Sequence, residues 1–225
     1  MYFPAELLPG ALGAGGQAIA AAALGYAVLR APWRRLAEPA QQHVFLGSIV
    51  FLLALWLIRT GIKPGLDLHF IGATALTLMF GPRLALVALG VVLAANTVAG
   101  AASWSGFGLS LLAVGAVPVA VSHVIFATAD RRLPNHLFVY VFANGFFGAA
   151  LAVAASGLAI CLLLAGSGVY SWGYLAREYL PYYVLLAWGE ALLTGMAVTL
   201  MVVYRPQWIA SFDDERYLSR DGDPR

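Results

Sequence analysis

The chain has 225 residues, and its composition is unlike that of a water-soluble protein. Hydrophobic residues make up 61% of it and charged residues 11%, whereas ordinary globular chains carry about 25% charged residues. A soluble fold of this size could not cover so much apolar surface, which excludes a cytosolic enzyme, a secreted disulfide scaffold and a disordered chain. The net charge of +2 gives no reason to expect a nucleic-acid partner. The composition therefore predicts a multi-spanning membrane protein.

Long apolar segments alternate with short stretches that hold most of the charges. Because a helix crosses a bilayer with about 20 apolar residues, we predict about seven spans, over 10–30, 43–59, 67–81, 84–102, 107–127, 136–166 and 181–204. The third is short for a span, which indicates a tilted or partly re-entrant helix. The sixth is long, so we expect it to be steeply tilted or broken near Gly157. The fold class is an all-α membrane bundle, with one transmembrane domain at 1–206 and a polar tail at 207–225.

The basic residues predict the orientation of the chain. Cytoplasmic loops carry an excess of lysine and arginine, and the side that holds the tail has seven arginines against three basic residues on the other side. We therefore expect the N-terminus outside, the tail in the cytoplasm as a solvated appendage, and a multi-pass location in the inner (cytoplasmic) membrane. The first span is expected to be retained, because the N-terminus lacks the basic start of a signal peptide. The tail-side residues are Arg30, Arg34, Arg35, Arg83, Arg131, Arg132 and Arg205, and the opposite ones are Arg59, Lys63 and Arg177.

Several polar side chains fall within the predicted spans, where an ionisable group must pair or face a cavity. Glu190 lies about ten residues into the last span, and two interpretations of it are equally favoured. It is either a functional group or a protonated carboxyl bonded to an asparagine or a backbone carbonyl of a neighbouring helix. Asn96 and Asn144 are expected to be interhelical hydrogen-bond partners. His123, near the cytoplasmic end of the fifth span, is expected to be a packing histidine.

His69 stands out because of its surroundings, GLDLHFIGATALTLMFGP, at the outer end of the third span. Asp67 is expected to be the N-cap of this helix. The imidazole of His69 could bind a transition metal such as Ni, Co, Cu or Zn at the outer mouth. A lone histidine binds no metal tightly, so partner ligands would have to come from elsewhere, and the outward N-terminus is the obvious source.

Motifs for catalysis are not found in the sequence. We see no phosphate-binding loop, no HExxH and no combination of a nucleophile with a base, so the chain is not expected to be an enzyme or to carry a covalent cofactor. If it takes part in ATP-driven transport, the ATPase must be a separate chain.

Three blocks, MYFPAELLPG, LHFIGATALTLMFGP and WGEALLTGMAVTL, occur in the order found in one transporter family. The chain resembles the CbiM/NikM-type substrate-capture membrane subunits of energy-coupling-factor ABC transporters for cobalt and nickel. The resemblance implies a divalent transition metal as the substrate (nickel, cobalt or copper). It also implies, as partners, a coupling transmembrane subunit, separate ATPase subunits and membrane lipids.

The resemblance also implies a metal site. In the family, the ion lies in a nitrogen cage made by the terminal amine, the amide and imidazole of residue 2, and a histidine of the third-helix block. Here these positions are Met1, Tyr2 and His69, so tyrosine stands where the family has histidine. The family's Gly-Ala-Asn and Asn-Met segment is also replaced, by SLLAVGAVPVAVSH.

Three hypotheses remain open. The first is a transporter subunit that binds a divalent metal with Met1, His69 and a water or Glu6. The second is a transporter subunit of the same fold with another cargo. The third is an accessory or scaffold subunit that keeps the fold without the metal site.

Overall fold

The computed structural model describes residues 3, 10–61, 63, 65–213 and 217. The protein is 81% helical, which confirms the all-α class. The α-helices are α1 (Gly10–Arg30), α2 (Pro39–Leu57), α3 (Ala73–Phe80), α4 (Pro82–Val98), α5 (Trp104–Leu111), α6 (Val117–Arg132), α7 (Leu137–Val139), α8 (Gly148–Gly166), α9 (Trp172–Glu178) and α10 (Leu180–Tyr204). The remaining elements are the 3-10 turns η2 (Trp33–Ala37) and η5 (Pro206–Trp208), the π-helical segments η3 (Leu112–Ala116) and η4 (Tyr140–Phe147), and the strands β1 (Thr60–Gly61) and β2 (Asp67–Leu68).

Within the described part of the chain, five helical stretches are long and apolar enough to cross a membrane, which supports a multi-pass membrane protein. The expected count of seven spans is not confirmed, because α4 has 17 residues and α3 only 8. The five stretches are Gly10–Arg30, Pro39–Leu57, Trp104–Arg132, Leu137–Gly166 and Leu180–Tyr204.

The third predicted span, 67–81, is helical only in its second half. It begins with β2, continues through non-helical residues to Gly72, and becomes helical only at Ala73. Gly72 is the residue before the helix and has a left-handed backbone, with φ of 74°, which glycine adopts without strain. The expectation that Asp67 is the N-cap is therefore wrong, because Asp67 lies in the strand, paired with Gly61.

The long sixth span is not broken near Gly157. Its helix runs from Leu137 to Gly166 and contains the π-helical segment η4 near its beginning. Gly157 lies inside α8, where a side chain would collide with the ring of Tyr183 in α10. Glycine at this position therefore permits close packing of two helices, as small residues do in membrane bundles.

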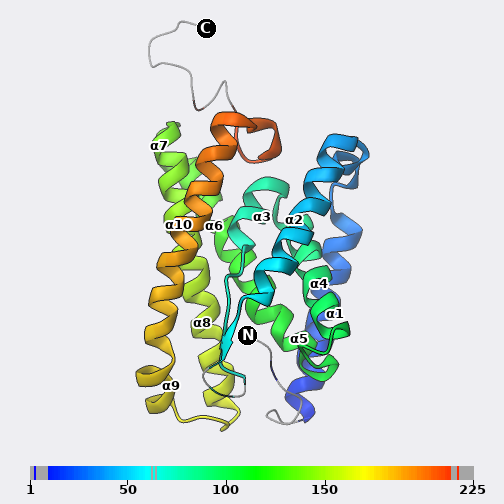
Figure 1. The fold of residues 1–225 in the computed structure, drawn as a ribbon, viewed down its shortest axis with the longest axis vertical. Helices are drawn as coiled ribbons and strands as arrows, with labels where there is room; N and C mark the ends of the chain where they lie inside the picture. Colours follow the sequence, from blue (N-terminus) through cyan, green and yellow to red (C-terminus); the bar gives the residue numbers. More distant parts are fainter. Residues whose placement is uncertain (1–2, 4–9, 62, 64, 214–216, 218–225) are drawn as a thin grey trace, which may run out of the picture.

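The helix α3 lies in the middle of the bundle, packed between α4 and α6 (Figure 1). One side of the molecule is formed by α6, α8 and α10, and the other by α1, α2, α4 and α5. At its end, α3 turns directly into α4 through Gly81, which has a φ of 82°, and Pro82. The FGP of the third-helix block therefore marks a reversal of the chain.

The beginning of the polar tail is packed rather than solvated, contrary to expectation. The backbone N–H groups of Ala210 and Ser211 donate to the carbonyls of Met79 and Leu78, at 3.0 and 3.2 Å. These carbonyls belong to the last turn of α3, which has no helical partners for them. Three side chains of the tail are buried against the same end of the bundle: Ile209, Phe212 and Tyr217.

We predict the orientation as a labelling pattern. The loop at Gly168 precedes α9, at one end of the molecule, whereas His136 precedes α7, at the opposite end (Figure 1). In a Cys161→Ser background, Gly168→Cys should react with a membrane-impermeant maleimide in intact cells and His136→Cys should not. The reverse pattern would contradict an outward N-terminus and a cytoplasmic tail.

Candidate metal-binding site

The segment that follows α2 carries His69 into the interior of the bundle. Its strands pair antiparallel, with Thr60 opposite Leu68 and Gly61 opposite Asp67. The hairpin returns the chain to the bundle, so the residue after β2 is buried: His69 is 2% exposed. A residue predicted at the outer end of a helix is thus found in an irregular segment within the protein.

The imidazole of His69 has a fixed orientation. Its Nδ1 lies 2.9 Å from the carbonyl oxygen of Phe70, and a carbonyl can only accept, so Nδ1 carries the proton. Burial lowers the pKa of His69 well below its ordinary value, which keeps the ring neutral. A neutral ring protonated on Nδ1 has its lone pair on Nε2, the state of a metal-ligating histidine.

Trp56, near the end of α2, forms one wall of this site. Its ring centroid lies 4.5 Å from that of His69, with the two planes tilted by 43°. The indole Nε1 donates to the carbonyl of Ile71 at 3.3 Å. Trp56 therefore holds both the imidazole and the backbone two residues further on.

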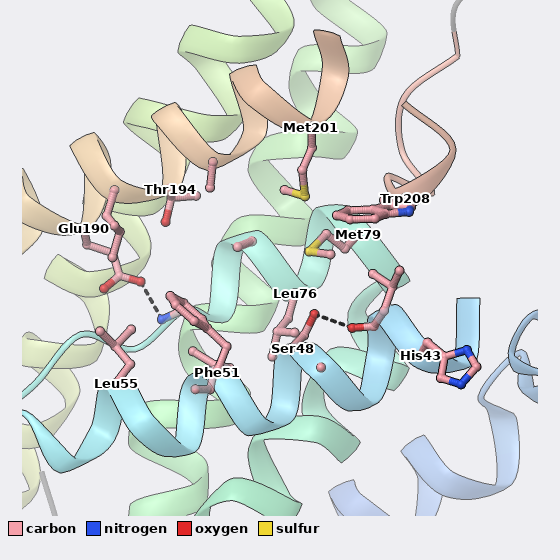
Figure 2. Close-up of a pocket in the computed structure, with 17 residues that line it drawn as sticks. His43, Ser48, Phe51, Leu55, Leu76, Met79, Glu190, Thr194, Met201 and Trp208 are labelled. Atoms are coloured by element: carbon pink, nitrogen blue, oxygen red, sulfur yellow. Dashed lines mark hydrogen bonds between the residues drawn. The ribbon is translucent and has the colours of Figure 1, made fainter. Parts of the chain in front are cut away.

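Glu190 binds the backbone of the same segment from the other side. Its two carboxylate oxygens accept from the N–H groups of Ile71, at 2.9 Å, and Gly72, at 2.5 Å. The bond to Gly72 is visible in Figure 2. The expected protonated carboxyl bonded to an asparagine or a carbonyl is therefore wrong: the partners are N–H donors, and Glu190 takes the capping role expected of Asp67.

The strand β2 is held by Tyr179, the residue directly before α10. The hydroxyl of Tyr179 donates to the carbonyl of Asp67 at 3.3 Å and lies 3.3 Å from the hydroxyl of Tyr183. Burial raises the pKa of Tyr179, so this phenol stays protonated and able to donate. The segment that contains His69 is thus fixed both before and after the imidazole.

The chain enters the core near its N-terminus, at Phe3, which is buried. Its N–H donates to Ser110 Oγ at 3.1 Å, and its carbonyl accepts from Ser103 Oγ at 3.2 Å. A side chain at Gly106 would overlap the Phe3 carbonyl. Phe3, Trp56 and Ile71 belong to one hydrophobic core, so the start of the chain and the segment of His69 share the same interior.

The other predicted polar residues lie apart from His69. Asn96 Nδ2 donates to Val92 O in its own helix, at 2.9 Å, so the interhelical role expected for it is wrong. Asn144 is buried in η4, and its side-chain oxygen has no hydrogen-bond partner among the described residues. His123 is exposed on α6, so the packing role expected for it is wrong. Ser122 bonds to Thr74 in α3, at 2.7 Å.

The described residues do not form a conventional metal cluster. Among them, no three His, Cys, Asp or Glu side chains gather around a common point. The predicted ligands Met1 and Tyr2, and also Glu6, lie outside the described residues. Of the predicted ligands, the structure therefore describes His69.

A separate groove of about 470 Å³ lies between α2 and α10, with α3 as its floor. Figure 2 shows Glu190 at one end and His43 and Trp208 at the other, with mostly apolar side chains between them. His69 does not line it. The groove and the His69 site are therefore distinct, and Glu190 separates them.

Three parts of the site were not foreseen from the sequence: Trp56, Ser103 and Ser110. Trp56 sits in an apolar helix, where a tryptophan also suits lipid contact. The serines had a possible signal, since Gly106 and Gly108 interrupt the same stretch and glycine marks the close approach of another backbone. The segment that approaches Gly106, at Phe3, is remote in sequence, so the contact between the two could not be predicted.

The described helices form a bundle of the membrane-spanning kind around a buried, neutral imidazole. The sequence profile of the family described as the cobalt uptake substrate-specific transmembrane region matches residues 2–208. The chain belongs to this family. It is a transport component and not an enzyme.

Solved structures share the fold. One, described as a truncated transition metal transporter, matches with a TM-score of 0.78 and 18% identity over 91% of this chain and 99% of its own. Another, described as a transition metal transporter, matches with a TM-score of 0.74 and 18% identity over 90% of this chain and 93% of its own. No curated protein matches the sequence.

The buried His69 predicts a pH dependence. A histidine whose pKa is lowered in the folded state binds a proton more readily when unfolded, so folding stability should fall as the pH drops through the ordinary value of about 6.5. Thermal unfolding in detergent between pH 7.5 and 5 should show this loss. His69→Gln should flatten the decline, whereas the matched change at an exposed histidine, His123→Gln, should not. An equal decline in all three proteins would contradict the prediction.

Proposed function

We propose that this protein is the substrate-capture subunit of an energy-coupling-factor-type ABC transporter for a divalent transition-metal ion of the cobalt and nickel class. The proposal is supported by the family match and, above all, by the buried neutral imidazole of His69. The subunit would lie in the inner membrane and work with a coupling transmembrane subunit and separate ATPase subunits.

The proposed ligands are the amine of Met1, the amide nitrogen of residue 2 and Nε2 of His69. Phe3 supports this set, because its N–H and carbonyl are bound in the core, which anchors the chain directly after residue 2. Nitrogen ligands of this kind favour Ni(II) or Cu(II) in tetragonal geometry. Tyr2 offers a phenol in place of the family's imidazole, which leaves the fourth position to a water or to Glu6.

The metal ion competes with protons for these ligands. The amine and the amide must each lose a proton to bind, whereas His69 is already neutral. Capture should therefore strengthen as the pH rises through the α-amino pKa of about 8. The imidazole adds no such dependence near neutral pH.

The first test is metal binding by purified protein whose first residue is Met1. Titration with Ni(II) and Cu(II) should give binding that rises between pH 7 and 9. His69→Ala should abolish it, as should extra residues before Met1, because an extension removes the terminal amine. Tyr2→His should strengthen binding by restoring the fourth nitrogen, and His123→Ala should leave it unchanged.

The result also separates the alternatives. If neither the natural sequence nor Tyr2→His binds Ni(II), Co(II) or Cu(II), the metal proposal is wrong. Co-purification with a coupling subunit and an ATPase would then indicate a transporter of another cargo. Isolation without an ATPase would indicate an accessory or scaffold subunit.

A second test addresses the anchorage of the N-terminal segment. A methyl group at Gly106 would overlap the Phe3 carbonyl, whereas one at Gly15 meets nothing within 4 Å. Gly106→Ala should therefore weaken metal binding at least tenfold while Gly15→Ala binds as the natural sequence does. Calorimetric titration of both variants measures the difference, and equal affinities would argue against a site built on the N-terminal segment.

A further inference from the structure

The sequence blocks LHFIG and WGEA, 119 residues apart, contact each other in the fold. We call this contact the joint. Glu190 accepts from the N–H groups of Ile71 and Gly72, which come two and three residues after His69. Beside it, a side-chain carbon at Gly189 would come within 2.9 Å of the ring of Phe70. Two adjacent residues of α10 thus fit three successive residues of the segment that carries the imidazole.

The joint fixes a backbone that has no regular structure of its own. Residues 69–72 belong to neither β2 nor α3, although the carbonyl of Gly72 accepts from the N–H of Leu76 in α3, at 3.2 Å. Ile71 is held on both sides, with its carbonyl bonded to Trp56 and its N–H to Glu190. Gly72 is confined too, since a side chain there would collide with Leu52. The backbone between His69 and α3 is therefore held by side chains of other elements.

The carboxylate of Glu190 is matched to this task. It is 1% exposed and lies in the middle of a membrane-spanning helix, where a charge is costly unless it is paired. Two N–H donors at the N-terminus of α3 supply that pairing, aided by the helix dipole. Both oxygens thus bind peptide groups of the segment that carries His69.

From this geometry we propose that Glu190 is a positioning residue for His69: it sets the backbone from which the imidazole reaches the metal, without touching the ion. The role rests on the proposed function. Outer partners that orient a ligand raise metal affinity because the site is ordered before the ion arrives. Gly189 serves the same end by leaving room for Phe70.

The test compares Glu190→Gln with the natural sequence, both starting at Met1, by titration with Ni(II) and with Cu(II) at pH 8. Glutamine has one acceptor oxygen and places an NH₂ group against an N–H donor, so one of the two bonds is lost. We expect the affinity to fall about 10- to 100-fold, as for other outer partners of metal ligands. The visible absorption band of the bound ion should shift, because the ligand field changes when the imidazole moves.

Thr194→Val, one turn further along α10, is the matched control: it is buried and lines the same groove, and it should change neither affinity nor band. A cooperative thermal unfolding transition shows which variants are folded. If Glu190→Gln does not fold, Gly189→Ala replaces it, since this change keeps the carboxylate and displaces Phe70, with the same loss expected.

The outcomes are distinct. If the folded variants bind as tightly as the natural sequence, with the same band, the positioning role is wrong and the metal proposal stands. If the natural sequence and Tyr2→His bind neither ion, the metal proposal is wrong, and the positioning role falls with it. A loss confined to the joint, with Thr194→Val unaffected, supports the role.

Discussion

The fold depends on one constraint: α3 is a short helix whose two ends lie inside the protein. Peptide groups at helix ends have no partners within the helix, and in a membrane they cannot turn to water. At the beginning, Glu190 accepts from Ile71 and Gly72. At the other end, the amides of Ala210 and Ser211 bind the last carbonyls. Both sets of partners come from α10 or from the chain that directly follows it.

This arrangement joins the segment that carries His69 to the tail. The helix α3 has only 8 residues, about 12 Å of helix, and it connects the His69 segment directly to the packed tail. The residues that bind the two ends of α3 therefore also fix the position of the backbone between His69 and Ala73. The position of His69 is therefore supported by the fold as a whole rather than by a local loop.

The sequence predicted the membrane class and most of the helices because apolar length is a strong, local signal. It also singled out His69 and Glu190, since an ionisable group in an apolar segment stands out against its neighbours. It could not assign Glu190 as the cap of α3, because its partners lie 118 and 119 residues away. The nearby Asp67 was the natural local candidate for the cap, but it lies in a two-residue strand of a hairpin. The packed tail was missed for a similar reason, as polar composition concealed three buried side chains.

The remote capping of α3 has a consequence for biogenesis. A ribosome delivers the chain from its N-terminus, so α3 enters the membrane long before residues 190 and 210–211 have been made. Until then, the peptide groups at both ends of this helix must be sheltered by the insertion machinery or by provisional partners. The native interior can close only when the final helix and the first residues beyond it have arrived, which makes the synthesis of residues 180–211 the step that completes assembly.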